Sequence, residues 1–280
     1  MKFLIIIPAH NEEKNIFFCL ESLTMQTFQD FRCVIVNDGS TDKTQEITEQ
    51  IKVQDSKFNL INLEKSVHEP GAKVVSTFNK GLETQNLEDF DIICKFDADI
   101  IFPPNYLEKV NDVFEKNPKA GMVSGLVHIF KNNEWQFENL SSKNHVRGPI
   151  KSYRKDLFLK MNGLKPVLGW DNIDVMLCKM HGYEVITLKN LWVKHLRPTA
   201  YKYQSQKAEK LGAYFYNIGL SFPLAAISSL KSSFKNKSVS EFFITIRSFL
   251  KQKNPRILSD NEIAYIRNLR WNEMFKKLKK

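Results

Sequence analysis

The sequence predicts an α/β fold in which a mostly parallel sheet carries helices on both faces. Short apolar segments rich in β-branched residues alternate with helix-like stretches in steps of about 25–35 residues, which is the pattern of successive βαβ units. Polar residues follow each of the first four apolar segments at once. Ligands of an open α/β sheet bind at the carboxyl ends of its parallel strands, so these polar clusters are expected to converge on one site.

The elements follow in order along the chain. The first hundred residues hold four predicted strands, 3–7, 31–37, 58–63 and 92–96, and three predicted helices, 13–27, 44–54 and 72–85. Farther along, the sequence predicts a strand at 121–130, a helix-containing segment at 148–164 that ends in a glycine turn, a helix at 169–182 that opens with acidic residues, and extended segments at 183–188 and 191–195.

The charge is unevenly distributed and divides the chain in two. Residues 201–280 hold 16 Lys and Arg against 5 Asp and Glu, a net charge of +11, whereas residues 1–200 have a net charge near −1. We therefore expect a globular domain over residues 1–200 and a basic, helical appendage over 201–280 that contacts an anionic membrane. Nucleic acid is not an expected partner, because the appendage lacks a recognisable nucleic-acid-binding module.

One stretch of the appendage allows two interpretations. Residues 211–230 contain no charged side chain, but they include Asn217, Pro223 and several serines, which argues against a transmembrane helix. The stretch is either an interfacial hairpin that inserts shallowly into a membrane or a helix that packs on the body of the protein.

The expected location is the cytoplasm, with peripheral attachment to the cytoplasmic face of the inner membrane. The opening segment MKFLIIIP is apolar for only five residues before Pro8, which is too short for a secretory signal. The four cysteines have neither the spacing of a metal knuckle nor that of a redox pair, so reduced thiols are expected.

Two carboxylates at the end of the fourth strand predict a metal site. Asp97 and Asp99 follow the apolar segment 92–96, and two carboxylates grouped in one cleft repel each other unless a cation lies between them. Mg²⁺ or Mn²⁺ prefers oxygen ligands and leaves room for phosphate oxygens. His195 follows a later extended segment and is a candidate third ligand, although a lone histidine is more often structural.

Phosphate binding by a glycine-rich loop is not expected. The sequence contains no G-x-x-x-x-G-K-[ST] segment, and no G-x-G-x-x-G follows the first strand. A metal ion with Lys73 and Arg197 would have to hold phosphate instead. Asp38 is the first polar side chain beyond the second strand, where its carboxylate could accept a hydrogen bond from a base or a ribose hydroxyl.

The acidic start of the predicted helix at 169–182 offers a general base. Asp171 and Asp174 lie about one helical turn apart and share a face. They could serve only to stabilise the helix N-terminus, or one of them could accept a proton from an acceptor hydroxyl. Trp170 is either a platform on which a sugar stacks or a core residue.

Together these segments resemble family 2 glycosyltransferases with a GT-A fold. The resemblance covers roughly residues 1–200 and rests on four segments in order: PAHNE, NDGSTD, FDAD and GWDNID. It implies a Rossmann-like mixed sheet, a nucleoside-diphosphate sugar donor, a divalent metal and inversion at the anomeric carbon. By position, it implies donor contacts from Pro8, Ala9, Glu12, Asp38, Lys73 and Asp97, and metal ligands at Asp99 and His195.

One segment departs from the common family pattern. Many members have Glu-Asp-x-Asp, in which the first Asp is the base, whereas here Asn172 stands at that position and cannot accept a proton in this role. The segment resembles a Gly-Trp-Asp-x-Ile-Asp variant of bacterial members. The base is therefore Asp171 or Asp174, and Asp171 is favoured because it lies nearest the preceding loop.

The expected function is transfer of a hexosyl group from a nucleotide sugar, with uridine as the expected nucleoside, to an acceptor hydroxyl. The acceptor is expected to be a glycan or a lipid-linked glycan in cell-surface polysaccharide synthesis. The main alternative is a non-catalytic protein that retains the nucleotide-sugar cleft, which Asn172 favours. A nucleotidyltransferase would have a glycine-rich basic loop after the first strand, and PAHNE is neither glycine-rich nor basic.

Overall fold

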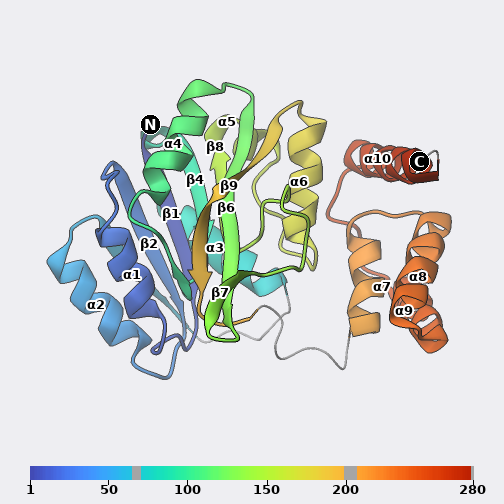
Figure 1. The fold of residues 1–280 in the computed structure, drawn as a ribbon, viewed down its shortest axis with the longest axis horizontal. Coiled ribbons are helices and arrows are strands. Elements are labelled where there is room, and N and C mark those ends of the chain that lie inside the picture. The colour runs from blue at the N-terminus through green and yellow to red at the C-terminus, as the bar shows by residue number, and fades with distance from the viewer. Residues whose placement is uncertain (65–70, 199–206, 279–280) are drawn as a thin grey trace.

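The computed structural model describes residues 1–64, 71–198 and 207–278 of the chain. At its centre is one sheet with the strand order β3-β2-β1-β4-β8-β6-β9-β5, and β7 pairs with β6. Helices cover both faces of this sheet, and a further group of helices lies at the C-terminal end of the chain (Figure 1). The strands are β1 (Phe3–Ala9), β2 (Phe31–Asp38), β3 (Phe58–Leu63), β4 (Ile92–Phe96), β5 (Ile100–Ile101), β6 (Ala120–Lys131), β7 (Glu134–Phe137), β8 (Ile150–Arg154) and β9 (Glu184–His195).

Strands β3, β2, β1 and β4 form a parallel half-sheet. Residues 3–7 of β1 and every residue of β4 are buried, because helices cover both faces of this half-sheet. Strands in that situation are continuous apolar runs without polar alternation. The four strands predicted from such runs are confirmed, and their carboxyl ends lie along one edge, as the parallel pairing requires.

The other half of the sheet is mixed. Strand β8 is antiparallel to both β4 and β6, whereas β9 is parallel to β6. The two extended segments predicted at 183–188 and 191–195 belong to one strand, β9, whose register against β6 shifts between Ser124 and Leu126. The predicted helix-containing segment 148–164 opens as strand β8 and becomes helical only at Lys155.

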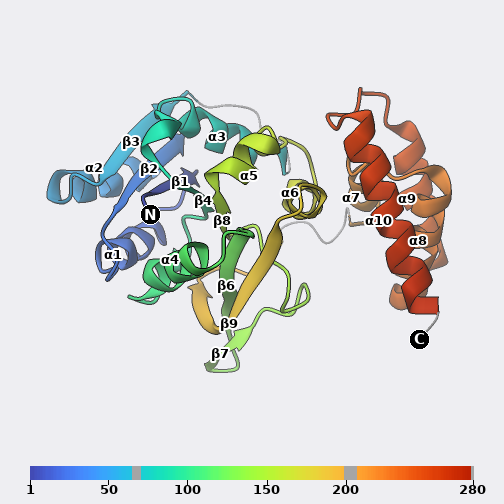
Figure 2. The same cartoon turned by 90° about the horizontal axis from the view of Figure 1, so that it is seen from above.

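An apolar core lies on each face of the sheet, between the strands and the helices that cover them. One core joins the sheet to α1, α2 and α4, and the other joins it to α3, α5 and α6 (Figure 2). The four cysteines are buried and free, as expected for reduced thiols. The helices of this body are α1 (Ile16–Thr24), α2 (Thr44–Gln54), α3 (Ala72–Leu82), the short 3-10 helix η1 (Leu87–Asp89), α4 (Tyr106–Lys116), α5 (Lys155–Lys160) and α6 (Trp170–Met180).

The C-terminal region is helical, as predicted, and lies beside α6 in both views (Figures 1 and 2). Helices α7 and α9 approach closely at Gly212, where an added Cβ would lie 2.3 Å from the carbonyl oxygen of Thr245. Within the described residues, no helix combines the length and the apolar character that a membrane span needs. The helices are α7 (Lys207–Asn217), α8 (Phe222–Asn236), α9 (Val239–Lys251) and α10 (Asp260–Leu278).

The uncharged stretch 211–230 is divided between two helices that pack on the body. It spans the end of α7 and the start of α8. Phe215, Ile218, Leu224 and Ala225 are all buried in the core that also contains α6. These contacts show that part of the stretch packs on the protein, whereas Phe222, Ile227 and Leu230 of the same stretch are exposed.

Candidate active site

Two adjoining cavities lie at the carboxyl ends of β1, β2 and β4. Their volumes are about 260 Å³ and about 400 Å³, and Gly71 and Val74 line both of them. The smaller, which we call the β1–β2 cavity, contains Pro8, Ala9, Glu12, Asp38 and Lys73. The larger, which we call the β4–α6 cavity, contains Asp97, Asp99, Trp170, Asp171, His195 and Arg197. All of the candidate site residues except Asp174 therefore line one of these two cavities.

The β1–β2 cavity is held in shape by contacts between the loops that follow β1 and β2. Asn11 accepts a hydrogen bond from the backbone N–H of Thr41 at 2.8 Å, and its own N–H donates to Ser40 Oγ at 3.0 Å. The N–H of Glu12 donates to Thr44 Oγ1 at 2.8 Å. Gly39, at a φ of 59°, makes the left-handed turn that brings the second loop back toward the first.

Asp38 and Lys73 form an ion pair inside the β1–β2 cavity. The Lys73 ammonium lies 2.7 Å from Asp38 Oδ2, and both side chains are largely buried. Glu69 and Pro70, which with Lys73 belong to the polar residues that follow the third predicted strand, lie outside the described residues. A carboxylate and an ammonium in the wall of a mainly apolar pocket suit a polar ligand with both donors and acceptors, such as a nucleoside.

Asp99, His195 and Arg197 meet in the β4–α6 cavity. Strand pairing brings them together, because Ile100 of β5 lies opposite His195 of β9. His195 Nε2 lies 3.4 Å from Asp99 Oδ1, and Arg197 Nη2 lies 3.0 Å from Asp99 Oδ2. Arg197 also forms an ion pair with Glu12, so it connects the two cavities.

These close charges shift the pKa values of the group. Burial alone would lower the pKa of His195, but hydrogen bonds to Asp99 and Glu138 and the charge of Asp99 raise it to about 9. Burial alone would raise the pKa of Asp99, but His195 and Arg197 lower it below its usual range. Burial raises the pKa of Glu12 despite its hydrogen bonds to Asn15 and Arg197.

Sequence reasoning missed three charged residues of this site. Lys95 forms an ion pair with Asp97, and it is a buried cation within the apolar strand β4, which is the one sequence signal that could have indicated it. Glu138 and Arg147 form a buried ion pair, and Arg147 lines the β4–α6 cavity. They lie in the irregular segment between β7 and β8, where no periodic pattern points to burial.

Asp174 has a structural setting. Its two carboxylate oxygens each lie 2.7 Å from the Lys151 ammonium, and Tyr153 and the N–H of Val175 also donate to it, at 2.5 Å and 2.6 Å. Burial raises its pKa, although Lys151 lowers it. The Asp174 carboxylate, occupied by four donor contacts and 3% exposed, ties α6 to β8.

Asp171 faces the cavity one turn earlier on α6. It is half-buried and lines the β4–α6 cavity with Asp97, Asp99 and His195. Among the described residues, its carboxylate has one hydrogen-bond partner, Asn172 Nδ2 at 3.4 Å. A carboxylate with so little of its hydrogen-bonding capacity used can accept a proton from a ligand.

Trp170 precedes Asp171 and is mostly buried. The ammonium groups of Lys95 and Lys151 lie 5.2 Å and 5.3 Å from the centroid of its ring system. Its side chain lines the cavity but is only 7% exposed, so a sugar would contact a small part of the ring. The preceding Gly169 has a φ of 95°, and a Cβ there would lie 2.4 Å from Tyr214 of α7.

The donor set at Asp99 and His195 fits a divalent cation that takes most of its ligands from elsewhere. In the described part of the chain, no group of three or more His, Cys, Asp and Glu side chains is arranged to hold a metal ion. Asp99 and His195 offer one oxygen and one nitrogen 3.4 Å apart. Mg²⁺ in nucleotide sites is commonly held by one or two protein ligands together with phosphate oxygens and water.

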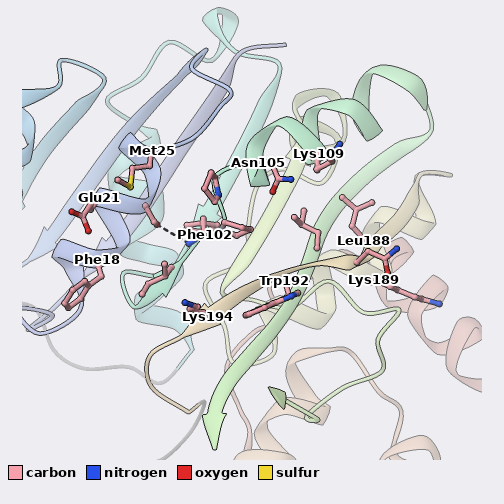
Figure 3. A pocket seen from close by; sticks show the side chains of 16 residues that line it. Phe18, Glu21, Met25, Phe102, Asn105, Lys109, Leu188, Lys189, Trp192 and Lys194 are labelled. Atoms are coloured by element: carbon pink, nitrogen blue, oxygen red, sulfur yellow. Dashed lines mark hydrogen bonds between the residues drawn. The ribbon is translucent and has the colours of Figure 1, made fainter. Parts of the chain in front are cut away.

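A larger cavity, of about 710 Å³, lies away from the strand ends and contains none of the candidate site residues. Figure 3 shows Phe18 of α1 and Met25, the residue that follows α1, on one side of it and Trp192 and Lys194 of β9 on the other. Its walls are mainly apolar, and Glu21 is its one carboxylate among the described residues. The grouped carboxylates that nucleotide chemistry needs are therefore at the strand ends and not in this cavity.

The raised pKa of His195 predicts a pH-dependent stability. The folded state holds the histidine proton more tightly than the unfolded state does, since the pKa rises from 6.5 to about 9. The resulting stabilisation is complete below about pH 6.5 and is lost as the pH rises through 9, an expected loss of about 3 kcal/mol. Urea unfolding in the presence of a chelator, from pH 6 to 9.5, measures the free energy of unfolding at each pH. If this free energy fell no more steeply with pH in the wild type than in His195→Gln, the prediction would be contradicted.

Comparison with known proteins identifies the family. Residues 4–165, more than half of the chain, match the family described as glycosyl transferase family 2. The glycosyltransferase GlyG of Streptococcus pneumoniae is 28% identical over 134 residues, which is 48% of this chain and 41% of the relative. The amylovoran biosynthesis glycosyltransferase AmsB of Erwinia amylovora is 26% identical over 253 residues, 85% of this chain and 74% of the relative.

The fold is likewise found among solved structures. The mannosyltransferase PcManGT of Pyrobaculum calidifontis, in complex with GDP-Man and Mn²⁺, superposes with a TM-score of 0.58 at 16% identity, over 98% of this chain and 75% of that one. The likeness shows a shared GT-A fold. The chain spans 28 to 56% of the length of the first curated relatives it matches. The match over residues 4–165 shows that the chain belongs to glycosyl transferase family 2.

Proposed function

We propose that the protein transfers a sugar from a nucleoside-diphosphate sugar to an acceptor hydroxyl. The observation that carries this proposal is the meeting of three groups at one sheet edge: the Asp38–Lys73 pair, the Asp99–His195–Arg197 cluster and the uncommitted carboxylate of Asp171. The first suits a nucleoside, the second a diphosphate with its metal, and the third an attacking hydroxyl. Family membership supports the same reaction class.

The donor would span the two cavities. Its nucleoside would lie in the β1–β2 cavity against Pro8 and Ala9, with Asp38 accepting hydrogen bonds from the base or ribose. The family resemblance favours uridine. Four Lys and Arg side chains line the two cavities near the expected diphosphate: Lys73, Lys95, Arg147 and Arg197. Arg197 would exchange its ion pairs with Glu12 and Asp99 for a bidentate phosphate contact.

Asp99 and His195 would hold Mg²⁺ or Mn²⁺, and the bound ion would neutralise charge on the diphosphate leaving group. His195 would have to lose its proton to bind the ion, and the carboxylates of Asp99 and Glu138 hold that proton in its absence. Metal affinity should therefore increase with pH over the range in which His195 titrates.

The chemical step would be a single displacement with inversion. The acceptor oxygen forms a bond to the anomeric carbon as the bond from that carbon to the diphosphate oxygen breaks. The proton of the acceptor hydroxyl passes to the side chain of Asp171, which lies on the wall of the β4–α6 cavity. Asp174 would act only by fixing α6, because Lys151 and Tyr153 already occupy its carboxylate.

The acceptor would be a glycan or a lipid-linked glycan of a cell-surface polymer. The support is a relative named for amylovoran biosynthesis that matches most of this chain. Trp170 would contact the acceptor sugar with the part of its ring that lines the cavity. Residues 1–200 would form the transferase domain, and residues 201–280 a unit with a different task.

Thermal unfolding with a panel of nucleotides tests donor binding. Addition of a matching nucleotide sugar at about 100 times its Kd, with Mn²⁺, should stabilise the protein by about 2.7 kcal/mol and raise the Tm by roughly 5 °C. A comparison of UDP and GDP at equal concentration identifies the nucleobase of the donor. A shift that occurs without any turnover in the presence of Mn²⁺ would favour the non-catalytic binding protein, and no shift with any nucleotide would contradict the proposal.

A further inference from the structure

Helix α8 carries apolar side chains on the face turned away from the protein. Ile227, Leu230 and Phe234 are exposed by 44%, 47% and 76%. Their spacing of three and four residues places them on one stripe of the helix. The buried residues of α8, which include Ala225, Ser229 and Ser233, occupy a different face. The helix therefore has one face for the protein and a second apolar stripe for a partner.

Helix α9 repeats the arrangement. Val239, Phe243 and Leu250 are exposed by 74%, 65% and 62%, with the spacing of a single stripe. Thr245 and Phe249 are buried on another face, against α7 and α8. Two consecutive helices that contact each other therefore both expose large apolar side chains. Single exposed apolar residues are common, but two such stripes on neighbouring helices indicate an interaction surface.

The charge beside the stripes is almost entirely positive. Between residues 222 and 258 the sequence has seven Lys and Arg and one acidic residue, Glu241. Lys231 and Lys235 of α8, and Arg247 and Lys251 of α9, are exposed and occupy the helix positions next to the apolar stripes. Each helix thus presents an apolar stripe bordered by cations on its exposed side.

We propose that the exposed stripes of α8 and α9 and the cations that border them, here called the α8–α9 surface, bind the surface of an anionic lipid bilayer. Large apolar side chains between cations suit the boundary between acyl chains and anionic headgroups. Attachment would be peripheral, with the helices lying in the plane of the interface. A second copy of the chain is disfavoured as the partner, because it would bring two strongly positive surfaces together.

The position of these helices would couple the membrane to the cleft. Helix α7 contacts α9 at Gly212, and its Asn217 donates a hydrogen bond to the carbonyl of Leu168 at 3.2 Å. Leu168 lies two residues before Trp170 and lines the β4–α6 cavity. Provided that the proposed transfer reaction is correct, a bilayer bound at α8 and α9 would hold the cavity at a fixed distance from lipid-borne acceptors.

Vesicle co-sedimentation of the full-length protein tests the proposal without any nucleotide sugar. The probes are vesicles of phosphatidylcholine alone and of phosphatidylcholine mixed with phosphatidylglycerol. The wild type should bind the mixed vesicles at least tenfold more tightly, and less tightly as salt increases. Two double variants test the two parts of the surface. One carries Phe234→Ser and Phe243→Ser, and the other carries Lys231→Gln and Lys251→Gln. Each should weaken binding at least tenfold.

Two matched control variants replace exposed residues on the body of the protein. One carries Val53→Ser and Phe130→Ser, and the other carries Lys43→Gln and Lys116→Gln. Both should leave vesicle binding unchanged. All of the substituted side chains are exposed, so unaltered thermal unfolding shows that the variants remain folded. Equal loss in the control and α8–α9 variants, or full binding by the α8–α9 variants, would overturn the proposal. Nucleotide binding is measured in parallel, so failure of one proposal is distinguishable from failure of the other.

Discussion

Replacement of Asp171 by asparagine is expected to lower kcat for sugar transfer by about 10²–10⁴-fold, the usual contribution of a general base. The substitution keeps the size of the side chain and removes its ability to accept the hydroxyl proton. Donor binding should be unchanged, because the nucleoside would lie in the β1–β2 cavity, which Asp171 does not line. Steady-state transfer at saturating donor, together with the Kd for the nucleoside diphosphate, separates the two effects.

Asp174→Asn is the matched control for this prediction. It changes the same type of side chain one turn along α6, but it leaves the buried Lys151 ammonium without its carboxylate. The expected effect is a loss of stability, of about 3–5 kcal/mol for a broken buried pair, measured by urea unfolding. The assignment of the base would be wrong if Asp171→Asn kept the wild-type kcat, or if a folded Asp174→Asn protein lost transfer while Asp171→Asn did not.

Asp99→Asn is expected to reduce transfer by at least about 10²-fold and to remove its dependence on Mn²⁺, since the metal would lose its one buried carboxylate ligand. The variant should also lose about 1–3 kcal/mol of stability, because the positive charges of His195 and Arg197 lose their shared partner. Assays across a Mn²⁺ titration, with urea unfolding in parallel, measure both effects.

Asp112→Asn provides the surface comparison for Asp99. Asp112 pairs with Lys109 and Lys116 on an exposed part of α4, where such pairs contribute little to stability. It should match the wild type in rate, Mn²⁺ dependence and unfolding. An Asp99→Asn protein that behaved like Asp112→Asn would contradict the proposed role of Asp99.

Much of the candidate site at the strand ends was predictable because the signals are local. The apolar run at residues 92–96 predicts a buried strand, and parallel strands place whatever follows them at one edge of the sheet. The same argument predicts that Asp38 and Asp99 lie in the same region, and they line adjoining cavities. The position of His195 after a later extended segment made it a candidate ligand, and strand β9 brings it opposite the start of β5.

The rest of the site depends on contacts that no local pattern records. The choice between Asp171 and Asp174 could not be made from spacing, because Lys151 and Tyr153, more than twenty residues away, determine which carboxylate is occupied. Glu138 and Arg147 lie in an irregular segment and are buried only through tertiary packing. The bulge in β9 likewise reflects its register against β6, which made one strand resemble two.

The central claim is that the joined cavities at the strand ends form a transferase active site. Its most direct test is the rate at which the protein releases nucleoside diphosphate from a nucleotide sugar with Mn²⁺, measured for the wild type, Asp171→Asn and Asp99→Asn with the donor that gives the largest thermal shift. With water as the sugar acceptor, the wild type should release nucleoside diphosphate and this release should stop when Mn²⁺ is chelated, whereas either variant should release little. Equal release by all three proteins would contradict the central claim.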